Sequence, residues 1–333
     1  MIRIPFKRDG FATEMKPKIS GANLSLEYDN IESSLMKVGA DIARILPQTL
    51  IDRLVKTYMS GAITGSTETA IDYLQRAMLH FAVFEHTIFL ITRVSNDGIT
   101  IKKNDDETTA YKYQVDELNN KLITTGWFWM NLLIQFLNEH LDDFPEWADS
   151  DQKKAFDELP VNLDDFNKWV GVSLAGGEYF MMYAGWIIRE VWIDCVRSRL
   201  PDPTITDILT RAVFDETFDE TFSGTDVKMK DAIIRAVCYE VMGRATQRLA
   251  YSALPEPIRI DIDNEMGKNH RAQADQYIRE YVSGEFLKKA VTYWNAVDLG
   301  IKKKEMEEDR KNAGDRPLIG KRNFDESDKF YYV

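Results

Sequence analysis

The sequence predicts a mainly α-helical fold: two tandem, related helical-bundle units, each with a short β excursion, between an extended N-terminal arm and a C-terminal tail. Apolar residues recur at helical spacing over most of the 333 residues. The segment Asp72–Ala77 returns as Asp231–Ala236, at an offset of 159 residues and without a gap. At the same offset, Gly98–Ile101 corresponds to Pro257–Ile260. Because an internal repeat identifies the folding unit, we expect two copies of one helical unit.

Residues 1–30 are predicted to form the N-terminal arm. Apolar side chains alternate at Ile2, Ile4 and Phe6, as they do in a strand, and prolines and glycines follow at short intervals. Too few apolar groups occur in this segment to build a core. We therefore expect the arm to contact a neighbouring molecule.

The first helical unit is expected over residues 31–147. Asn96, Asp97 and Gly98 have the chemistry of a turn, and the alternation of Ile99 and Ile101 predicts a short strand. The predicted helices of this unit cover residues 31–47, 50–58, 68–94 and 109–140, with Ser66 or Thr67 as the cap of the third.

Residues 148–163 are the predicted linker, and residues 164–300 are the second unit. Asp164 and Asp165 are interpreted as caps at a helix start. Pro257, Ile258 and Ile260 are expected in a second short strand, before a polar loop over residues 261–267. Further helices are predicted over residues 177–199, 227–250 and 272–297, and a charged tail over residues 301–333 ends in Phe330, Tyr331 and Tyr332.

Composition limits the classes of function. A hydrophobic content of 44% allows a substantial core, and the length favours two domains over one. The chain has 42 basic and 54 acidic residues, and the resulting net charge of −12 opposes broad attraction to nucleic acid or to anionic lipid. An acidic surface is compatible with DNA that passes by without binding.

No spacing typical of a catalytic, cofactor or metal site is found, so we predict that the protein is not an enzyme and has no cofactor. Cys195 and Cys238 lie in apolar helical stretches and are interpreted as buried thiols. The four histidines lack the spacing that places ligands on one helical face. The N-terminus lacks the apolar core of a secretory signal, and the longest apolar stretch, Met78–Ile91, is too short to span a bilayer.

Two further groups of residues have both a structural and a functional interpretation. Arg76 and Arg235 are equivalent across the repeat, and they either bind acidic groups at a subunit junction or extend their polar ends from an apolar helix. Trp127, Phe128 and Trp129 form an aromatic cluster that could stack bases. Their helical spacing favours core packing instead.

Four segments of the sequence stand out together: the run Leu74–Phe84, the Ser95–Ile99 turn, the helix Ala110–Leu137 with Gly126 and Trp127, and the Phe144-Pro145-Glu146-Trp147 signature. With these segments the sequence resembles a known but uncharacterised family from phages and prophages of Bacteroidetes. The resemblance covers about residues 31–215. Such proteins are similar to head–tail connector (adaptor) subunits of tailed phages, which assemble as a ring below the portal.

This resemblance implies a virion protein that is made in the host cytoplasm and that carries no catalytic residues to transfer. It implies a cyclic homo-oligomer, for which twelve-fold is one candidate symmetry, in contact with the portal protein and a tail or second ring protein. DNA would pass through the lumen without specific binding, and no membrane is involved. The candidate interface residues are Ile2, Ile4, Phe6, Asn96, Asp97, Gly98, Ile99, Ile101, Pro257, Ile258, Ile260, Phe330, Tyr331 and Tyr332.

Two alternatives remain open at this point. One is a soluble helical enzyme whose site forms between the two units, around His80, Glu85 and His86. The other is an adaptor for host proteins that forms no ring. A large cyclic oligomer would favour the neck ring, whereas a monomer that binds a metabolite would favour the enzyme.

Overall fold

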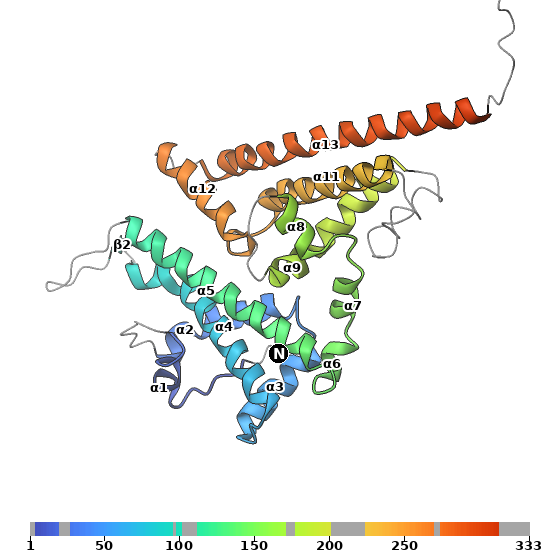
Figure 1. Cartoon of the computed structure of the whole chain (residues 1–333). Coiled ribbons are helices and arrows are strands. Elements are labelled where there is room, and N and C mark those ends of the chain that lie inside the picture. Colours follow the sequence, from blue (N-terminus) through green and yellow to red (C-terminus); the bar gives the residue numbers. More distant parts are fainter. Residues whose placement is uncertain are drawn as a thin grey trace, which may run out of the picture.

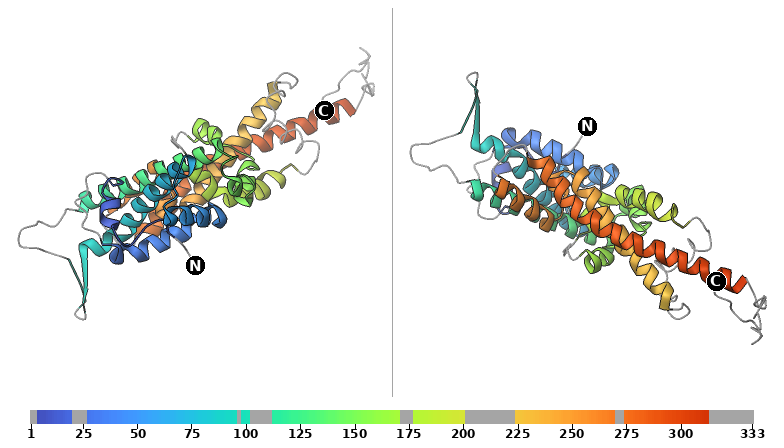
Figure 2. Two further views of the ribbon diagram at one scale, coloured as in Figure 1. Left: turned by 90° about the horizontal axis from the view of Figure 1, so that it is seen from below. Right: turned by 90° about the horizontal axis from the view of Figure 1, so that it is seen from above.

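The computed structural model describes residues 4–19, 27–95, 98–101, 112–170, 177–200, 224–269 and 274–312. These residues are folded almost entirely as helices, which confirms the predicted mainly α fold (Figure 1). The body is elongated: Figure 2 shows a short pair of strands at one end and the C-terminal part of a long helix at the other.

Two long helices, α4 (Ser66–Ile91) and α5 (Lys112–Glu139), pack side by side at the centre of the first half (Figure 1). Helix α2 (Tyr28–Ile42) packs on α4, and α3 (Gln48–Ser60) also contacts it. Helix α4 begins two residues before the expected position. Ser66 and Thr67 therefore lie inside its first turn.

The strands β1 (Thr92–Ser95) and β2 (Gly98–Ile101) follow α4 directly and pair in an antiparallel register. Val94 lies opposite Ile99, and Ser95 lies opposite Gly98. The short strand predicted from Ile99 and Ile101 is thus confirmed. These two strands are the complete sheet within the described part of the chain.

Three short helices connect the two halves: α6 (Pro145–Ala148), α7 (Asp151–Asp157) and α8 (Leu163–Trp169). Trp147 is completely buried, and its Nε1 donates to Asn138 Oδ1 over 3.0 Å. At the start of α8, Asn162 is the N-cap and Asp165 completes a capping box, because each side chain bonds the backbone N–H of the other. Asp165 therefore takes part in the cap as predicted, whereas the N-cap residue itself is Asn162.

The second half has a similar arrangement. Helix α9 (Glu178–Val191) continues into a π-helical turn, η1 (Trp192–Arg197), and packs on α11 (Gly224–Arg248). Helix α11 in turn packs along α13 (Ala274–Asn312), as α4 packs along α5.

The long helices of the two halves start at corresponding positions in the sequence. Moving Ser66 by 159 residues reaches position 225, one residue after the start of α11. Moving Lys112 by the same offset reaches position 271, three residues before the start of α13. In addition, α2 packs on α4 as α9 packs on α11. The arrangement agrees with a repeated unit, while the exact domain boundaries remain a prediction.

The second predicted strand is wrong. Ile258 and Ile260 lie in helix α12 (Glu256–Asn269), which follows a short 3₁₀ turn, η3 (Tyr251–Ala253). Ile258 and Ile262 are both fully buried and stand four residues apart, which is the spacing of one helical face, whereas Ile260 is exposed. The predicted polar loop over residues 261–267 belongs to the same helix.

The N-terminal segment is not a free arm within residues 4–19. Ile4, Phe6 and Phe11 are buried in the core, and Met15 and Ile19 are buried with them. The short helix α1 (Phe11–Met15) is held against α4, where Gln75 donates to Glu14 over 2.7 Å and Lys18 pairs with Asp72 over 2.6 Å. Five apolar side chains are enough for this segment to join an existing core, although they could not form one alone.

The predicted C-terminal tail also differs from its expected form. Helix α13 continues through residue 301 as far as Asn312, so the first part of the tail is helical. The remaining residues, 313–333, lie outside the described residues.

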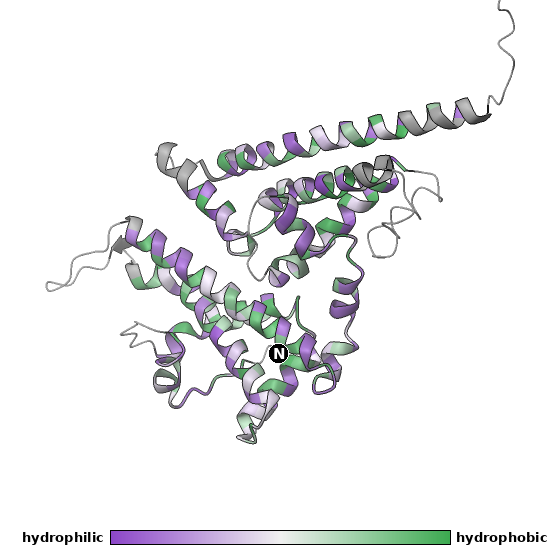
Figure 3. Cartoon of the chain, in the orientation of Figure 1, coloured by the Kyte–Doolittle hydropathy of each residue, from purple (hydrophilic) through white to green (hydrophobic). Residues whose placement is uncertain are grey.

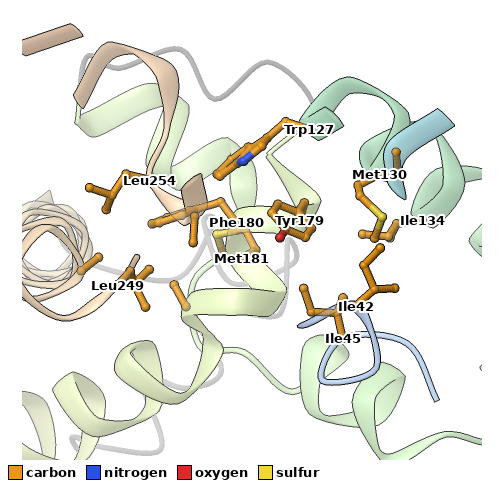
Figure 4. Packing of buried hydrophobic residues seen from close by; sticks show 14 of the residues in the cluster. Ile42, Ile45, Trp127, Met130, Ile134, Tyr179, Phe180, Met181, Leu249 and Leu254 are labelled. Atoms are coloured by element: carbon orange, nitrogen blue, oxygen red, sulfur yellow. The ribbon is translucent and has the colours of Figure 1, made fainter. Parts of the chain in front are cut away.

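One hydrophobic core extends through both halves. At the junction, Tyr179, Phe180 and Met181 of α9 lie between residues of the first and second halves (Figure 4). The neighbouring residues labelled in Figure 4 from the first half are Ile42, Ile45, Trp127, Met130 and Ile134. Those from the second half are Leu249 and Leu254. The region between the two copies is therefore filled by large apolar side chains.

Candidate functional site

The strand-bearing end of the molecule carries an unusual set of exposed apolar side chains. Ile88, Phe89 and Leu90, the last turn of α4 before its final residue, are 57%, 53% and 37% exposed. Leu118, near the start of α5, is 51% exposed. Three consecutive apolar residues span most of a helical turn and cannot all face one core. We call these four side chains, together with strands β1 and β2, the hairpin-end surface.

Strands β1 and β2 extend this surface away from the helices (Figure 2). In a two-stranded sheet each strand has one unpaired edge, whose N–H and C=O groups can pair with a strand of another chain. Isolated two-stranded sheets are marginally stable in water. A hairpin that projects from the body therefore suits contact with a partner.

Helix α12 is fixed to α5 next to this surface by a polar network. Asp263 accepts hydrogen bonds from Tyr251 over 2.6 Å and from Asn120 over 2.9 Å. Burial and the hydrogen bond to Asp263 raise the pKa of the Tyr251 hydroxyl. The fully buried Arg259 donates to the Leu254 carbonyl over 2.6 Å and to Thr124 Oγ1 over 2.8 Å. These bonds join the second half to the base of the hairpin end.

A cavity of about 410 Å³ opens beside this network, between α4, α5 and the turn that precedes α12. Its walls are mostly apolar, with Phe84, Ile88 and Val115 among them. Glu85 also lines it and forms an ion pair with Lys37. The side-chain amide oxygen of Asn119, Oδ1, is buried at the edge of this cavity and accepts no hydrogen bond from the described residues.

The residues of the alternative enzyme site lie in separate environments. His80 bonds the Arg76 carbonyl through Nδ1 over 2.7 Å, and burial lowers the pKa of its imidazole. The ring of His86 lies 5.5 Å from that of Phe89, and Glu85 alone of the three lines the cavity. Among residues that the structure describes, no three His, Cys, Asp or Glu side chains gather as a metal site would require.

The two arginines that are equivalent across the repeat both lie over an aromatic ring of the same chain. The Arg76 guanidinium bonds Asp72 over 2.6 Å and lies 4.7 Å from the centre of the Trp129 ring. The Arg235 guanidinium lies 3.7 Å from the centre of the Trp169 ring. In the single chain, both therefore stack on aromatic faces rather than extending into solvent.

The three neighbouring aromatic residues of α5, Trp127, Phe128 and Trp129, differ in how deeply they are buried. Trp127 is buried and donates to the Ser252 carbonyl over 2.7 Å, so it belongs to the core. Trp129 is partly buried against the core. Phe128 is 53% exposed.

The structure separates the predicted interface residues into three groups. Gly98, Ile99 and Ile101 form strand β2 on the hairpin-end surface, and Ile260 is exposed on α12. Ile4, Phe6 and Ile258 are buried inside the chain and Pro257 is partly buried, so these residues cannot form an open contact surface. The remaining predicted residues lie outside the described residues: Ile2, Asn96, Asp97, Phe330, Tyr331 and Tyr332.

Sequence reasoning missed the exposed end of α4. The stretch from Met78 to Ile91 is considered in the sequence analysis only as a possible membrane span, although its apolar residues cover more than one helical face near the end. Ile88, Phe89 and Leu90 in succession are the signal that could have identified this surface.

A family model matches residues 42–157 and 205–304, which is more than half of the chain. The chain belongs to the family of unknown function DUF6712. When the first matched segment is moved by 159 residues it becomes 201–316, and the second segment lies inside that range. Each of the two matched segments thus lies largely within one half of the chain.

No curated protein and no solved structure matches the chain. Among the described residues of this DUF6712 member, no helix combines the length and the apolar character needed to cross a bilayer.

Proposed function

We propose that this chain is a structural subunit of a tailed-phage virion: a head–tail connector that forms a ring between the portal protein and the tail. The observation that carries the proposal is the hairpin-end surface, where a projecting β hairpin stands beside exposed Ile88, Phe89 and Leu90. Exposed contiguous apolar groups mark interaction sites in soluble proteins. The resemblance to phage connector proteins supports the choice of partner.

The shape of the molecule suits this role. A closed ring is built from heterologous contacts, in which one face of each copy binds a different face of the next. An elongated body with a projecting hairpin at one end can reach an adjacent ring while its sides contact neighbouring copies (Figure 2). The net charge of −12 suits a lumen through which DNA moves without being held.

The proposal is tested by assembly of the full chain with the portal protein encoded in the same genome. Purified proteins are mixed, and complexes are detected by native mass spectrometry and negative-stain electron microscopy. We expect ring-shaped complexes with the wild-type chain. Absence of any ring and of any complex with the portal protein would contradict a connector role, whether the chain alone is a monomer or a dimer.

Two matched variants locate the contact. Phe89→Asp places a charge on the hairpin-end surface, where the side chain is 53% exposed, so the fold should tolerate it. We expect it to reduce portal binding at least tenfold. Met59→Asp, a similar change at a 47% exposed position on α3, should bind as the wild type does. Equal binding by both variants would exclude the hairpin-end surface as the contact.

A further inference from the structure

Helix α13 has a buried inner face that packs on α11. Its buried residues are Ile278, Val282, Ser283, Phe286, Ala290, Trp294 and Val297. The two helices approach closely where Ser283 Oγ donates to the Gly243 carbonyl over 2.8 Å. This contact accounts for one side of α13 only.

The opposite face of α13 also carries large apolar side chains, and these are exposed. Figure 3 shows hydrophobic and hydrophilic residues alternating along the length of α13. Tyr277, Tyr281, Val291, Leu299 and Met306 are 66%, 51%, 54%, 59% and 56% exposed. At 3.6 residues per turn they fall within an arc of about 80°. A helix that is apolar on two opposite faces packs against something on each of them.

The spacing along this face is that of a helix–helix seam. Between the exposed apolar residues, Gly284, Lys288, Asn295 and Lys302 lie in the same arc. Together the nine positions follow one another at intervals of three or four residues, as do the a and d positions of a coiled coil. We call these nine residues the outer stripe: Tyr277, Tyr281, Gly284, Lys288, Val291, Asn295, Leu299, Lys302 and Met306.

We infer that the outer stripe binds a second copy of this chain, with the two α13 helices antiparallel. In a parallel pair each residue lies opposite the same residue of the second copy. Lys288 and Lys302 would then each face another lysine, and Gly284 would face another glycine. Like charges in contact destabilise such a pair, and facing glycines leave a gap.

The antiparallel pair removes these conflicts. With the two-fold axis beside Val291, Tyr277 meets Met306 of the second copy, and Tyr281 meets Lys302. A methionine sulfur beside an aromatic ring and a lysine over one are both favourable contacts. Gly284, where an added Cβ would meet no atom within 4 Å, then receives Leu299 of the second copy. Large residues thus face small or complementary ones along the stripe.

The stripe is also long enough for a stable contact. From Tyr277 to Met306 it extends roughly 44 Å at 1.5 Å per residue. A helix pair of this length buries on the order of 800 Å² on each copy, which is the size of a standard protein interface.

This inference does not depend on the connector role. A two-fold contact joins two copies only, so it is distinct from the heterologous contact that closes a ring. Loss of portal binding would leave the α13 pair intact, and loss of the α13 pair would leave the hairpin-end surface intact. The two proposals can therefore fail separately.

Single cysteines on α13 test the pairing in the full chain, using a short bifunctional thiol reagent and the mass of the denatured product. Val291→Cys lies beside the two-fold axis and should cross-link two copies efficiently. Tyr277→Cys alone should not, because its two copies are separated by about 44 Å in the antiparallel pair. A mixture of Tyr277→Cys and Met306→Cys should give a cross-linked pair. The wild type, whose Cys195 and Cys238 are buried, is the control.

The outcomes decide the proposal. Cross-linking of Tyr277→Cys with itself would show a parallel seam and overturn the antiparallel one. Failure of Val291→Cys to cross-link would overturn the self-contact altogether.

A second measurement uses variants that keep the fold. Leu299→Glu adds a charge to the outer stripe and should raise the dissociation constant of the pair at least tenfold in sedimentation equilibrium. Ala296→Glu adds the same charge to an exposed position of α13 outside the stripe, and it should self-associate as the wild type does. Equal effects of the two variants would contradict the inference.

Discussion

Because His80 on α4 is buried, the free energy of unfolding depends on the protonation of its side chain, and therefore on pH. The imidazole is only 7% exposed, and its Nδ1 lies 2.7 Å from the carbonyl of Arg76, one helical turn earlier. Burial lowers the pKa of His80 below its ordinary value of 6.5. The hydrogen bond to the Arg76 carbonyl opposes this shift, and the nearby charge of Arg76 adds to it. The folded chain therefore favours the neutral ring with a proton on Nδ1.

The sign of the effect follows from proton binding. Between the folded and the unfolded pKa of His80, the unfolded chain binds more protons, so stability rises with pH. The contribution is complete above about pH 6.5 and is lost as the pH falls toward the folded pKa. We expect His80→Gln to lose less unfolding free energy than the wild type between pH 7.5 and 5.5, as measured by urea denaturation.

His140→Gln is the matched control for this experiment. His140 lies on α5, and its Nδ1 also contacts the carbonyl four residues earlier, at 2.9 Å, but the side chain is less buried. A reduction of the same size in His140→Gln would show that burial of His80 is not the cause. If His80→Gln and the wild type lose equal stability on acidification, His80 is not the group that titrates.

At the scale of elements, the two long helix pairs depend on a close approach at one glycine each. In the α4–α5 pair, a Cβ on Gly126 would lie 2.6 Å from the Phe81 ring, and in the α11–α13 pair a Cβ on Gly243 would lie 2.6 Å from Leu287. The Phe81 ring cannot move aside easily, because it is buried and stacked on Tyr179 at 5.8 Å. These glycines set how closely the helices pack.

We predict that Gly126→Ala lowers the free energy of unfolding by about 1–3 kcal/mol. The overpacking cost outweighs the gain of up to about 1 kcal/mol that alanine brings to a helix interior. Gly284→Ala is the control, since an added Cβ there meets no atom within 4 Å. Measured by urea denaturation at low protein concentration, it should be neutral or stabilising. Equal destabilisation by both changes would refute the close-packing argument.

The buried position of Ile258 in helix α12 makes this residue unsuitable for testing assembly by substitution with a charged residue. Ile258 is completely buried, so Ile258→Asp would place a charge in the core and disrupt folding. Ile99 lies in a strand at the hairpin end instead. Charge substitutions that test assembly therefore belong on exposed residues such as Phe89.

At the scale of the whole molecule, the two halves share one core. Tyr179 stacks against Phe81 of the first half, and Trp127 contacts both Tyr179 and Phe180. Arg259 and Asp263 add hydrogen bonds from α12 to α5. Separating the halves would expose these aromatic rings and leave buried polar groups without partners.

We therefore expect the two halves to unfold together. Amide hydrogen exchange in α4 and α11 should show the same dependence on urea concentration in its slowest protons, and calorimetry should show a single transition. A first half that unfolds at a distinctly different urea concentration from the second would show two independent domains instead.

Several features of the fold could be predicted from the sequence because they depend on local patterns. Helical spacing of apolar residues identified the long helices, and the turn chemistry before Ile99 identified strand β2. The offset of 159 residues also matches the positions of α4 and α11.

Other features depended on contacts that no local pattern contains. Alternating Ile258 and Ile260 suggested a strand, but the core that receives Ile258 and Ile262 selects a helix. The N-terminal segment has too few apolar residues for a core of its own, yet Phe6 and Phe11 are buried in one that other segments supply.

The sequence by itself determined the helical class, the repeat and the lack of familiar catalytic spacing. The tertiary structure alone decided which apolar residues are covered, because burial depends on segments far apart in the chain. In the folded structure Ile4 and Phe6 are buried in the core, whereas Phe89 of α4 and Leu299 of α13 are exposed.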